Sequence, residues 1–309
     1  MTDGSFSHLG IVSFRHSRHQ KWKNEKIANP KIIQLHFSNK CNLNCDFCPT
    51  VALKKEHDLD YSKELSKEKW FDIIEEANNM GVDEWHVCGG GEPLIDKEKA
   101  LDLMELMKKN NARGELITNG TLVDKETAKK LVDIDWDLIT FSIDGPSKEI
   151  NDSIRSEGSF EAVANGKYLS YIRKDDTPLL RIHTVLCKEN YRYIEEMIEL
   201  TNEMGFDEIR FNSLNIWSEE GAEYKLSDDE IRKTKEKMYD ALERAKELKI
   251  DTNINEFIEN NLLENANEID KAMLEETKDK SENTGFSNLS CYYPWYNIAI
   301  FADGRVAPC

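Results

Sequence analysis

Short apolar runs alternate with longer amphipathic stretches between Lys31 and Trp217. The apolar runs predict six β-strands, at residues 32–37, 84–88, 114–118, 138–143, 179–187 and 208–213. The stretches between them carry apolar residues three or four positions apart and predict five helices, at 67–80, 97–110, 125–132, 160–173 and 193–204. Strands that alternate with helices indicate parallel strands joined by right-handed crossovers. The expected fold is therefore α/β, built on a parallel sheet.

Three other regions depart from this alternation. Residues 1–30 show no sustained period and are expected to form an N-terminal extension. Residues 218–288 form an acidic connecting region, whose helical part from 226 to 249 should present its charged face to solvent. Residues 289–309 end in two apolar runs around Asp303-Gly304, a dipeptide that favours tight hairpin turns. This last region is expected to be a separate small unit.

Composition narrows the classes of partner. The 309 residues include 41 Lys and Arg against 59 Asp and Glu, a formal net charge of −18. Such an acidic chain argues against binding to nucleic acid or to an anionic membrane. No apolar stretch reaches the roughly 20 residues that span a bilayer, and residues 1–10 lack the pattern of a secretory signal. We therefore expect a cytoplasmic protein.

Three of the seven cysteines, Cys41, Cys45 and Cys48, lie within eight residues, directly after the first predicted strand. In a reducing compartment, clustered cysteines indicate a metal site rather than a disulfide scaffold. Thiolates suit zinc or an iron–sulfur cluster. Structural zinc sites and ferredoxin clusters normally have four protein ligands, and no fourth cysteine lies nearby. Three ligands would leave one coordination position open for another molecule.

Loops rich in Gly, Asn and Asp follow the predicted strands, at the edge where parallel α/β folds bind ligands. The segment 89–93 reads Gly-Gly-Gly-Glu-Pro. Its glycines would let the backbone approach a ligand closely, and its carboxylate could accept hydrogen bonds from an ammonium group. For Asn119-Gly120 and Asp144-Gly145, ordinary turns remain the alternative to ligand contacts.

The cysteine spacing Cys-x3-Cys-x2-Cys, with Phe47 just before the third cysteine, resembles the radical S-adenosylmethionine (SAM) superfamily. The resemblance implies a partial, TIM-like (β/α)6 barrel over residues 31–217. It also implies that Cys41, Cys45 and Cys48 bind a [4Fe-4S] cluster, whose fourth iron is chelated by SAM. Reductive cleavage would give methionine and a 5′-deoxyadenosyl radical that takes hydrogen from a substrate. An electron donor such as flavodoxin or ferredoxin is implied as a partner.

The same resemblance assigns eight residues to the SAM site: Phe47, Gly90, Gly91, Glu92, Asn119, Ser142, Asp144 and Arg155. The Gly-Gly-Glu segment would bind the amino group of the methionine moiety. The polar residues at the third and fourth strand ends would reach the ribose and the carboxylate. Arg155 would lie near the SAM carboxylate, and its alternative is a charge on a helix surface. No catalytic acid or base is assigned.

A second resemblance lies at the end of the sequence. Cys291, Gly304 and Cys309 have the spacing Cys-x12-Gly-x4-Cys, which is similar to the opening of the SPASM/twitch extension. That extension helps to bind auxiliary [4Fe-4S] clusters. The further cysteines of its pattern do not follow Cys309, so we expect a truncated extension with half of an auxiliary site. Two unrelated reduced cysteines are the alternative.

Eight further residues are expected to be structural: Cys88, Cys187, His36, His86, His183, Trp70, Trp136 and Trp217. A free cysteine behaves as a small hydrophobe and suits a buried strand end. The histidines lie within strands without a carboxylate or serine partner at a meaningful spacing, so we expect them to line the barrel. The tryptophans lack the interleaved basic residues of a stacking platform for nucleic acid.

The leading hypothesis is a radical SAM enzyme of the SPASM/twitch type that acts on a peptide or protein. A dehydrogenase or epimerase of small polar molecules in the same superfamily is the first alternative. The second is a non-catalytic protein in which the three cysteines hold zinc or a cluster. The third is an enzyme of unrelated chemistry on a β-α barrel.

Overall fold

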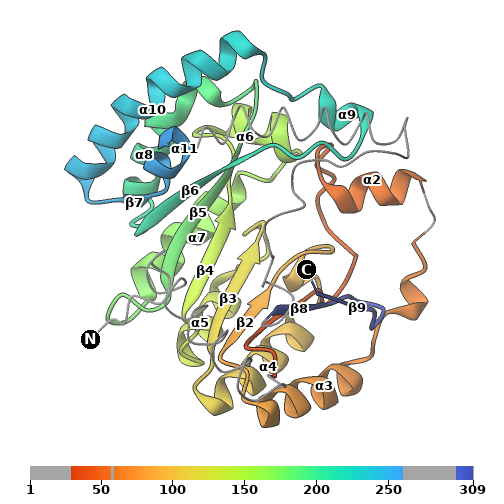
Figure 1. The fold of residues 1–309 in the computed structure, drawn as a ribbon. Helices are drawn as coiled ribbons and strands as arrows, with labels where there is room; N and C mark the ends of the chain where they lie inside the picture. The colour runs from red at the N-terminus through yellow and green to blue at the C-terminus, as the bar shows by residue number, and fades with distance from the viewer. Residues whose placement is uncertain (1–28, 57–58, 260–296, 309) are drawn as a thin grey trace, which may run out of the picture.

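The structure is a computed structural model that describes residues 29–56, 59–259 and 297–308. These residues build a nine-stranded sheet in the order β7-β6-β5-β4-β3-β2-β1-β8-β9 (Figure 1). All neighbouring strands are parallel except β8 and β9. The strands are β1 (Ile32–Leu35), β2 (Glu84–Val87), β3 (Arg113–Thr118), β4 (Leu138–Ser142), β5 (Leu179–Leu186), β6 (Glu208–Ser213), β7 (Asp251–Thr252), β8 (Asn297–Ile300) and β9 (Val306–Ala307).

Helices fill the connections between the strands, and the longer ones pack on the outer face of the curved sheet (Figure 1). They are α2 (Pro49–Glu56), α3 (Lys67–Met80), α4 (Lys97–Met107), α5 (Lys125–Asp133), α6 (Lys148–Arg155), α7 (Glu161–Ile172), α8 (Ile194–Glu203), α9 (Glu219–Ala222), α10 (Asp228–Leu248) and α11 (Ile254–Glu259). Short 3-10 turns occupy η1 (Tyr61–Lys63), η2 (Pro93–Asp96), η3 (Lys108–Asn110) and η4 (Tyr191–Tyr193). The α/β prediction with parallel strands is confirmed, and the described sheet is open rather than a closed barrel.

Local sequence explains where the predicted elements begin and end. Helix α3 starts after Ser66, whose hydroxyl accepts from the Lys69 N–H at 3.4 Å, and it stops at Gly81 with a φ of 78°. Its buried stripe contains Trp70, Ile74 and Ala77, at the spacing of one helical face. The predicted range 67–80 is confirmed for this helix, and the other predicted elements differ only at their ends.

Side chains alternate along the strands between a helix-covered face and an inner face. In β5, Leu180, Ile182 and Leu186 are buried against the helices, whereas Arg181 and His183 point to the opposite face. This inner face is therefore polar, and it lies below the loops that follow the carboxyl ends of the strands. The sheet therefore has an apolar face toward the helices and a polar face on its other side.

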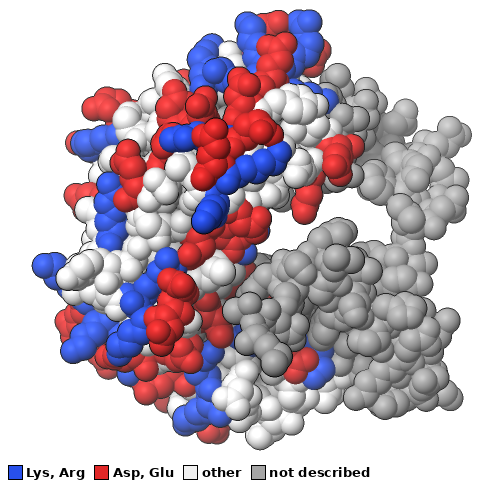
Figure 2. Space-filling model, turned by 90° about the vertical axis from the view of Figure 1, so that its left-hand side faces the viewer, with Lys and Arg blue, Asp and Glu red and all other residues white. Residues whose placement is uncertain are grey.

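The beginning of the acidic connecting region belongs to the main sheet. β7 pairs in parallel with β6, at Glu208↔Asp251 and Ile209↔Thr252. Helix α10 buries residues three or four positions apart, which are Ile231, Thr234, Met238, Ala241 and Ala245. Its remaining face is charged, as expected, and Figure 2 shows acidic and basic side chains interspersed over the side of the molecule that carries α10.

The short α6 and α2 were not predicted.

The C-terminal hairpin is confirmed, but it is not a separate unit. β8 pairs with β9, and it also pairs in parallel with β1, so that Ile298 lies beside Ile33. The turn is also longer than the expected two residues. The Phe301 N–H donates to the Arg305 carbonyl at 2.9 Å, and Gly304 closes a three-residue loop with a φ of 83°. Residues 1–28 lie outside the described part of the chain.

Large aromatic side chains fill the layer between sheet and helices. Trp70, Trp85 and Trp136 are fully buried, which confirms packing roles for Trp70 and Trp136. Trp217 is 57% exposed, and its predicted packing role is wrong because it lies in the loop after β6, outside the helical layer. None of the helices in the described residues has the length and apolar composition of a bilayer span.

Replacing Gly114 by alanine should destabilise the fold. A Cβ at Gly114 would come within 2.4 Å of the Trp136 ring, and this overpacking should cost about 1–3 kcal/mol. Gly221→Ala is the matched control, since its nearest neighbours would be 3.4 Å away. Urea unfolding curves measure both. Equal midpoints for the two variants would show that the Trp136 contact does not limit the packing.

Candidate functional site

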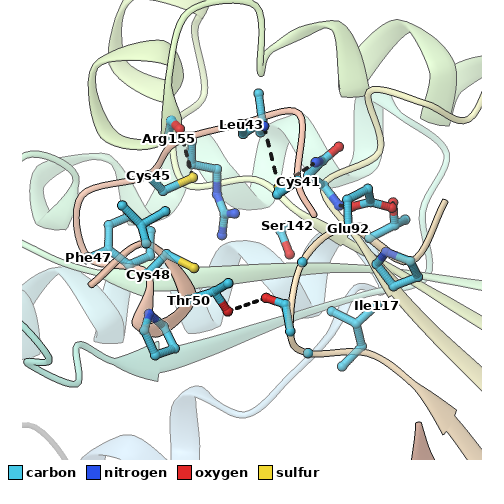
Figure 3. A pocket seen from close by; sticks show the side chains of 18 of the residues that line it. Cys41, Leu43, Cys45, Phe47, Cys48, Thr50, Glu92, Ile117, Ser142 and Arg155 are labelled. Atoms are coloured by element: carbon cyan, nitrogen blue, oxygen red, sulfur yellow. Dashed lines mark hydrogen bonds between the residues drawn. The ribbon is translucent and has the colours of Figure 1, made fainter. Parts of the chain in front are cut away.

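A cavity of about 260 Å³ opens at the carboxyl end of β1 to β4 (Figure 3). Loops after four strands and the end of α6 converge on it. Ten of the predicted site residues line it: Cys41, Cys45, Phe47, Cys48, Gly90, Gly91, Glu92, Asn119, Ser142 and Arg155. These residues are spread over more than a hundred positions in the sequence, and the parallel topology brings them to one edge of the sheet.

The cysteine loop is closed by a turn and a helix. The Cys48 N–H donates to the Cys45 carbonyl at 3.0 Å, and the Ala52 N–H donates to the Cys48 carbonyl at 3.0 Å. Helix α2 therefore begins directly at Cys48, with Pro49 at its first position, where no amide hydrogen is needed. The amino-terminal end of the helix therefore lies directly beside the cysteine loop.

Two of the thiols already have hydrogen-bond partners. The Cys41 sulfur accepts from the Leu43 N–H at 3.4 Å and from Asn119 Nδ2 at 3.9 Å. The Cys45 thiol donates to the Arg155 carbonyl at 2.8 Å. Burial raises the pKa of Cys45 to about 12, although the charge of Arg155 opposes that shift. A bound metal centre would supply the positive charge that such buried thiols need to lose their protons.

The three cysteines present their thiols to one space. Cys41, Cys45 and Cys48 all line the same cavity, and Figure 3 shows the sulfurs of Cys45 and Cys48 directed into it. Three thiolates fit an iron–sulfur cluster that leaves one iron for another ligand, and thiolates also suit zinc.

Backbone hydrogen bonds connect the Gly-Gly-Glu loop to the loop that carries Cys41. The Gly91 N–H donates to the Ser38 carbonyl at 2.7 Å, and the Glu92 N–H donates to the Lys40 carbonyl at 2.9 Å. A Cβ at Gly91 would lie 1.9 Å from the Lys40 carbonyl oxygen, so only glycine permits this approach. The two loops thus form one rigid wall of the cavity.

Glu92 is the buried centre of that wall. Its carboxylate accepts hydrogen bonds from Thr118 Oγ1 at 2.6 Å, the Asn119 N–H at 2.8 Å and the Leu94 N–H at 3.1 Å. Burial raises the pKa of Glu92, while these three donors act in the opposite direction. The carboxylate therefore ties the loops after β2 and β3 together, a role that the sequence did not predict.

Asn119 and Ser142 occupy the wall formed by the next two strands. The Asn119 amide donates to Asn42 Oδ1 at 2.9 Å and accepts from Thr121 Oγ1 at 2.7 Å. Asn119 thus connects the loop after β3 to the cysteine loop, and Ser142 lines the cavity at the end of β4. Both side chains are placed where a ligand in the cavity could meet them.

Asp144, the remaining residue assigned to the SAM site, is not among the residues that line the cavity. It is fully buried, and its Oδ1 accepts from the Val185 N–H at 2.7 Å. Its Oδ2 lies 2.6 Å from Arg155 Nε. Asp144 therefore lies behind Arg155. Arg155 is the member of the pair that lines the cavity.

Sequence reasoning missed the contribution of α2. Thr50, Val51 and Lys54 from this helix line the cavity, and Thr50 Oγ1 donates to the Gly90 carbonyl. The signal was present, because a proline directly after Cys48 is typical of the first position of a helix. Thr118 was also missed, since its role depends on a glutamate from another strand.

The three histidines lie outside this cavity's lining. His86 Nε2 is 2.6 Å from Glu84 Oε1, so the expectation of no carboxylate partner is wrong for His86. Residues two apart on a strand share a face, which explains the pairing. Cys88 and Cys187 are buried as expected, at 7% and 2% exposure. Cys291 and Cys309 lie outside the described residues.

The sequence profile of the radical SAM superfamily matches residues 35–201, which is more than half of the chain. Fe-coproporphyrin III synthase of Methanosarcina barkeri is 26% identical over 218 residues, covering 70% of this chain and 52% of that protein. Mycofactocin maturase MftC of Mycolicibacterium smegmatis is 30% identical over 177 residues, covering 57% of this chain and 43% of that protein. The chain spans about half the length of these curated relatives.

A solved structure shares the fold. The crystal structure of Streptococcus suis SuiB bound to precursor peptide SuiA is similar with a TM-score of 0.65. The match covers 95% of this chain and 63% of the SuiB chain, at 19% sequence identity. At this identity the similarity establishes the common architecture.

Replacing Thr118 by valine should destabilise the site wall. The change removes a donor to the buried Glu92 carboxylate and an acceptor for the Gly120 N–H, and it should cost about 1–3 kcal/mol. Thr252→Val is the matched control, because the buried Thr252 hydroxyl has no hydrogen-bond partner among the described residues. Chemical denaturation at pH 7 compares them, and an equal effect of both substitutions would contradict the role of Thr118.

Proposed function

The chain belongs to the radical SAM superfamily, and we propose that it is an enzyme that cleaves SAM reductively at a [4Fe-4S] cluster held by Cys41, Cys45 and Cys48. When bound, the cluster and SAM supply a 5′-deoxyadenosyl radical that abstracts hydrogen from a substrate. The observation that carries the proposal is the convergence of the three cysteines with the Gly-Gly-Glu loop on one cavity.

The chain's own residues bind and orient the cofactor in this proposal. Gly90 and Gly91 give close backbone access to the cavity, and Glu92 keeps that loop in place. Asn119 and Ser142 offer hydrogen-bond partners for ribose hydroxyls. Arg155 offers a guanidinium for a carboxylate, which it can bind with two parallel hydrogen bonds.

The apolar part of the cavity protects the reaction. Leu43, Val51 and Ile117 contribute hydrocarbon side chains to the lining, next to the thiols. Such a surface keeps water away from a reactive intermediate and strengthens the electrostatic interactions inside the cavity. Lys54 adds a second cation to the same lining.

Cleavage of SAM tests the proposal directly. After anaerobic reconstitution with iron and sulfide, the chain should form 5′-deoxyadenosine from SAM and dithionite, as measured by mass spectrometry. Cys41→Ala, Cys45→Ala and Cys48→Ala should each reduce this product to background. Cys187→Ala removes a buried thiol outside the cavity lining and should retain the activity.

Iron and sulfide analysis of the same samples separates the alternatives. About four irons and four sulfides per chain are expected for the proposed cluster. One zinc without sulfide, together with no 5′-deoxyadenosine, would favour the non-catalytic metal-binding protein instead. Product formation by the triple cysteine variant would exclude the proposed mechanism.

We further propose that the substrate is a peptide or protein. One relative is named a maturase, and SuiB shares the fold and was crystallised with a precursor peptide. A small-molecule substrate is the second candidate, because another relative is named Fe-coproporphyrin III synthase. Flavodoxin or ferredoxin is the proposed class of electron donor.

Deuterium transfer distinguishes the two substrate classes. Cells grown in heavy water supply a deuterated peptide digest and a separate deuterated small-molecule fraction. If the substrate is a peptide, only the digest should raise the mass of 5′-deoxyadenosine by one deuterium, because the abstracted atom comes from the substrate. Labelling by the small-molecule fraction alone would contradict the peptide assignment. Unlabelled versions of both fractions are the controls.

A further inference from the structure

Arg155 and Asp144 form an ion pair directly behind the cysteine loop. Arg155 Nε lies 2.6 Å from Asp144 Oδ2, and the side chains are 10% and 0% exposed. A charge in so little solvent interacts with its neighbours far more strongly than a surface charge does. The pair therefore places two opposite, poorly solvated charges beside the cysteine loop, and the nearer charge acts more strongly on the thiols.

Three hydrogen bonds to neighbouring elements hold Asp144 in place. Its carboxylate accepts from the Val185 N–H at 2.7 Å, and its own N–H donates to Asn151 Oδ1 at 2.8 Å. Its carbonyl accepts from Asn190 Nδ2 at 2.9 Å. Because Asp144 is buried and hydrogen-bonded in this way, its ion pair positions the Arg155 side chain.

The positive member of the pair faces the cysteines. The Arg155 guanidinium lies 5.7 Å from the centre of the ring of Phe47, a residue of the cysteine loop. The Arg155 carbonyl accepts from the Cys45 thiol at 2.8 Å. Figure 3 shows the guanidinium extending into the cavity beside the sulfurs of Cys45 and Cys48. Arg155 lines the cavity, whereas Asp144 lies behind it.

We infer that this pair sets the reduction potential of the cluster proposed for Cys41, Cys45 and Cys48, with Arg155 raising the potential and Asp144 limiting the rise. The inference rests on the proposed function only for the identity of the cluster. Reduction adds one electron from an external donor to the cluster, with no bond made or broken and no proton transferred. A nearby positive charge stabilises the added electron, and a nearby negative charge opposes it.

This role differs from binding the carboxylate of SAM. A contact with SAM acts only when SAM is present, whereas the effect on the potential exists in the cluster-loaded chain alone. Asp144 is a positioning residue for Arg155 and a second charge in the same field. Removing either charge should therefore shift the potential, and the two shifts should have opposite signs.

The test is a potentiometric titration of the reconstituted full chain without SAM, with dithionite as reductant and the reduced cluster followed by electron paramagnetic resonance. Arg155→Met should lower the midpoint potential, and Asp144→Asn should raise it. Arg155→Lys keeps the charge and should stay near the unsubstituted chain. Arg173→Met is the control, because Arg173 is buried to a similar degree as Arg155 and pairs with Asp207, away from the cavity lining.

Opposite shifts at Arg155 and Asp144, with no shift for Arg173→Met, support the inference. Shifts of the same sign, or none, overturn it and leave the pair a purely structural role. If Arg155→Met does not retain a cluster, Asp144→Asn decides alone, since an unchanged potential overturns the inference. A chain that binds the cluster and shows these shifts but forms no 5′-deoxyadenosine would refute only the proposed function.

Discussion

The close backbone contact between the loops after β1 and β2 is the constraint on which the site depends. The Gly91 N–H meets the Ser38 carbonyl, and the Glu92 N–H meets the Lys40 carbonyl, immediately before Cys41. The Glu92 carboxylate also accepts a hydrogen bond from Thr118, which connects the same loop to β3. The eight-residue cysteine loop thus lies against a rigid wall, and its three thiols line one cavity. A site whose loops are already held in place loses less conformational entropy when a metal centre binds.

Much of the fold could be predicted because each β-α unit carries a local signal. The apolar strands and the amphipathic helices between them required only periodicity and capping residues, as helix α3 shows with Ser66 and Gly81. The relation of the C-terminal hairpin to the sheet could not be predicted in this way. The pairing of β8 with β1 joins segments from opposite ends of the sequence, and no local pattern in either strand specifies its neighbour.

The site was predictable as a set of residues but not as a set of interactions. The cysteine spacing and the resemblance to the radical SAM superfamily identified ten residues that line the cavity. Spacing could not show that the Glu92 carboxylate is occupied by protein donors, or that Asp144 is drawn behind Arg155. These interactions depend on which side chain of a neighbouring strand lies close enough to make contact. Tertiary packing, rather than the local sequence, determines those neighbours.

The position of β8 has a consequence for the synthesis of the protein. Ile32 pairs with Asn297, and the His36 N–H donates to the Ile300 carbonyl at 3.0 Å, just before the cysteine loop. During translation, this edge of β1 therefore has no strand beside it until residues 297–300 have left the ribosome. The loop that carries Cys41 is synthesised more than two hundred residues before this support. Before then, the loop is supported on one side only, by its contacts with the strands and loops that follow it directly in the sequence.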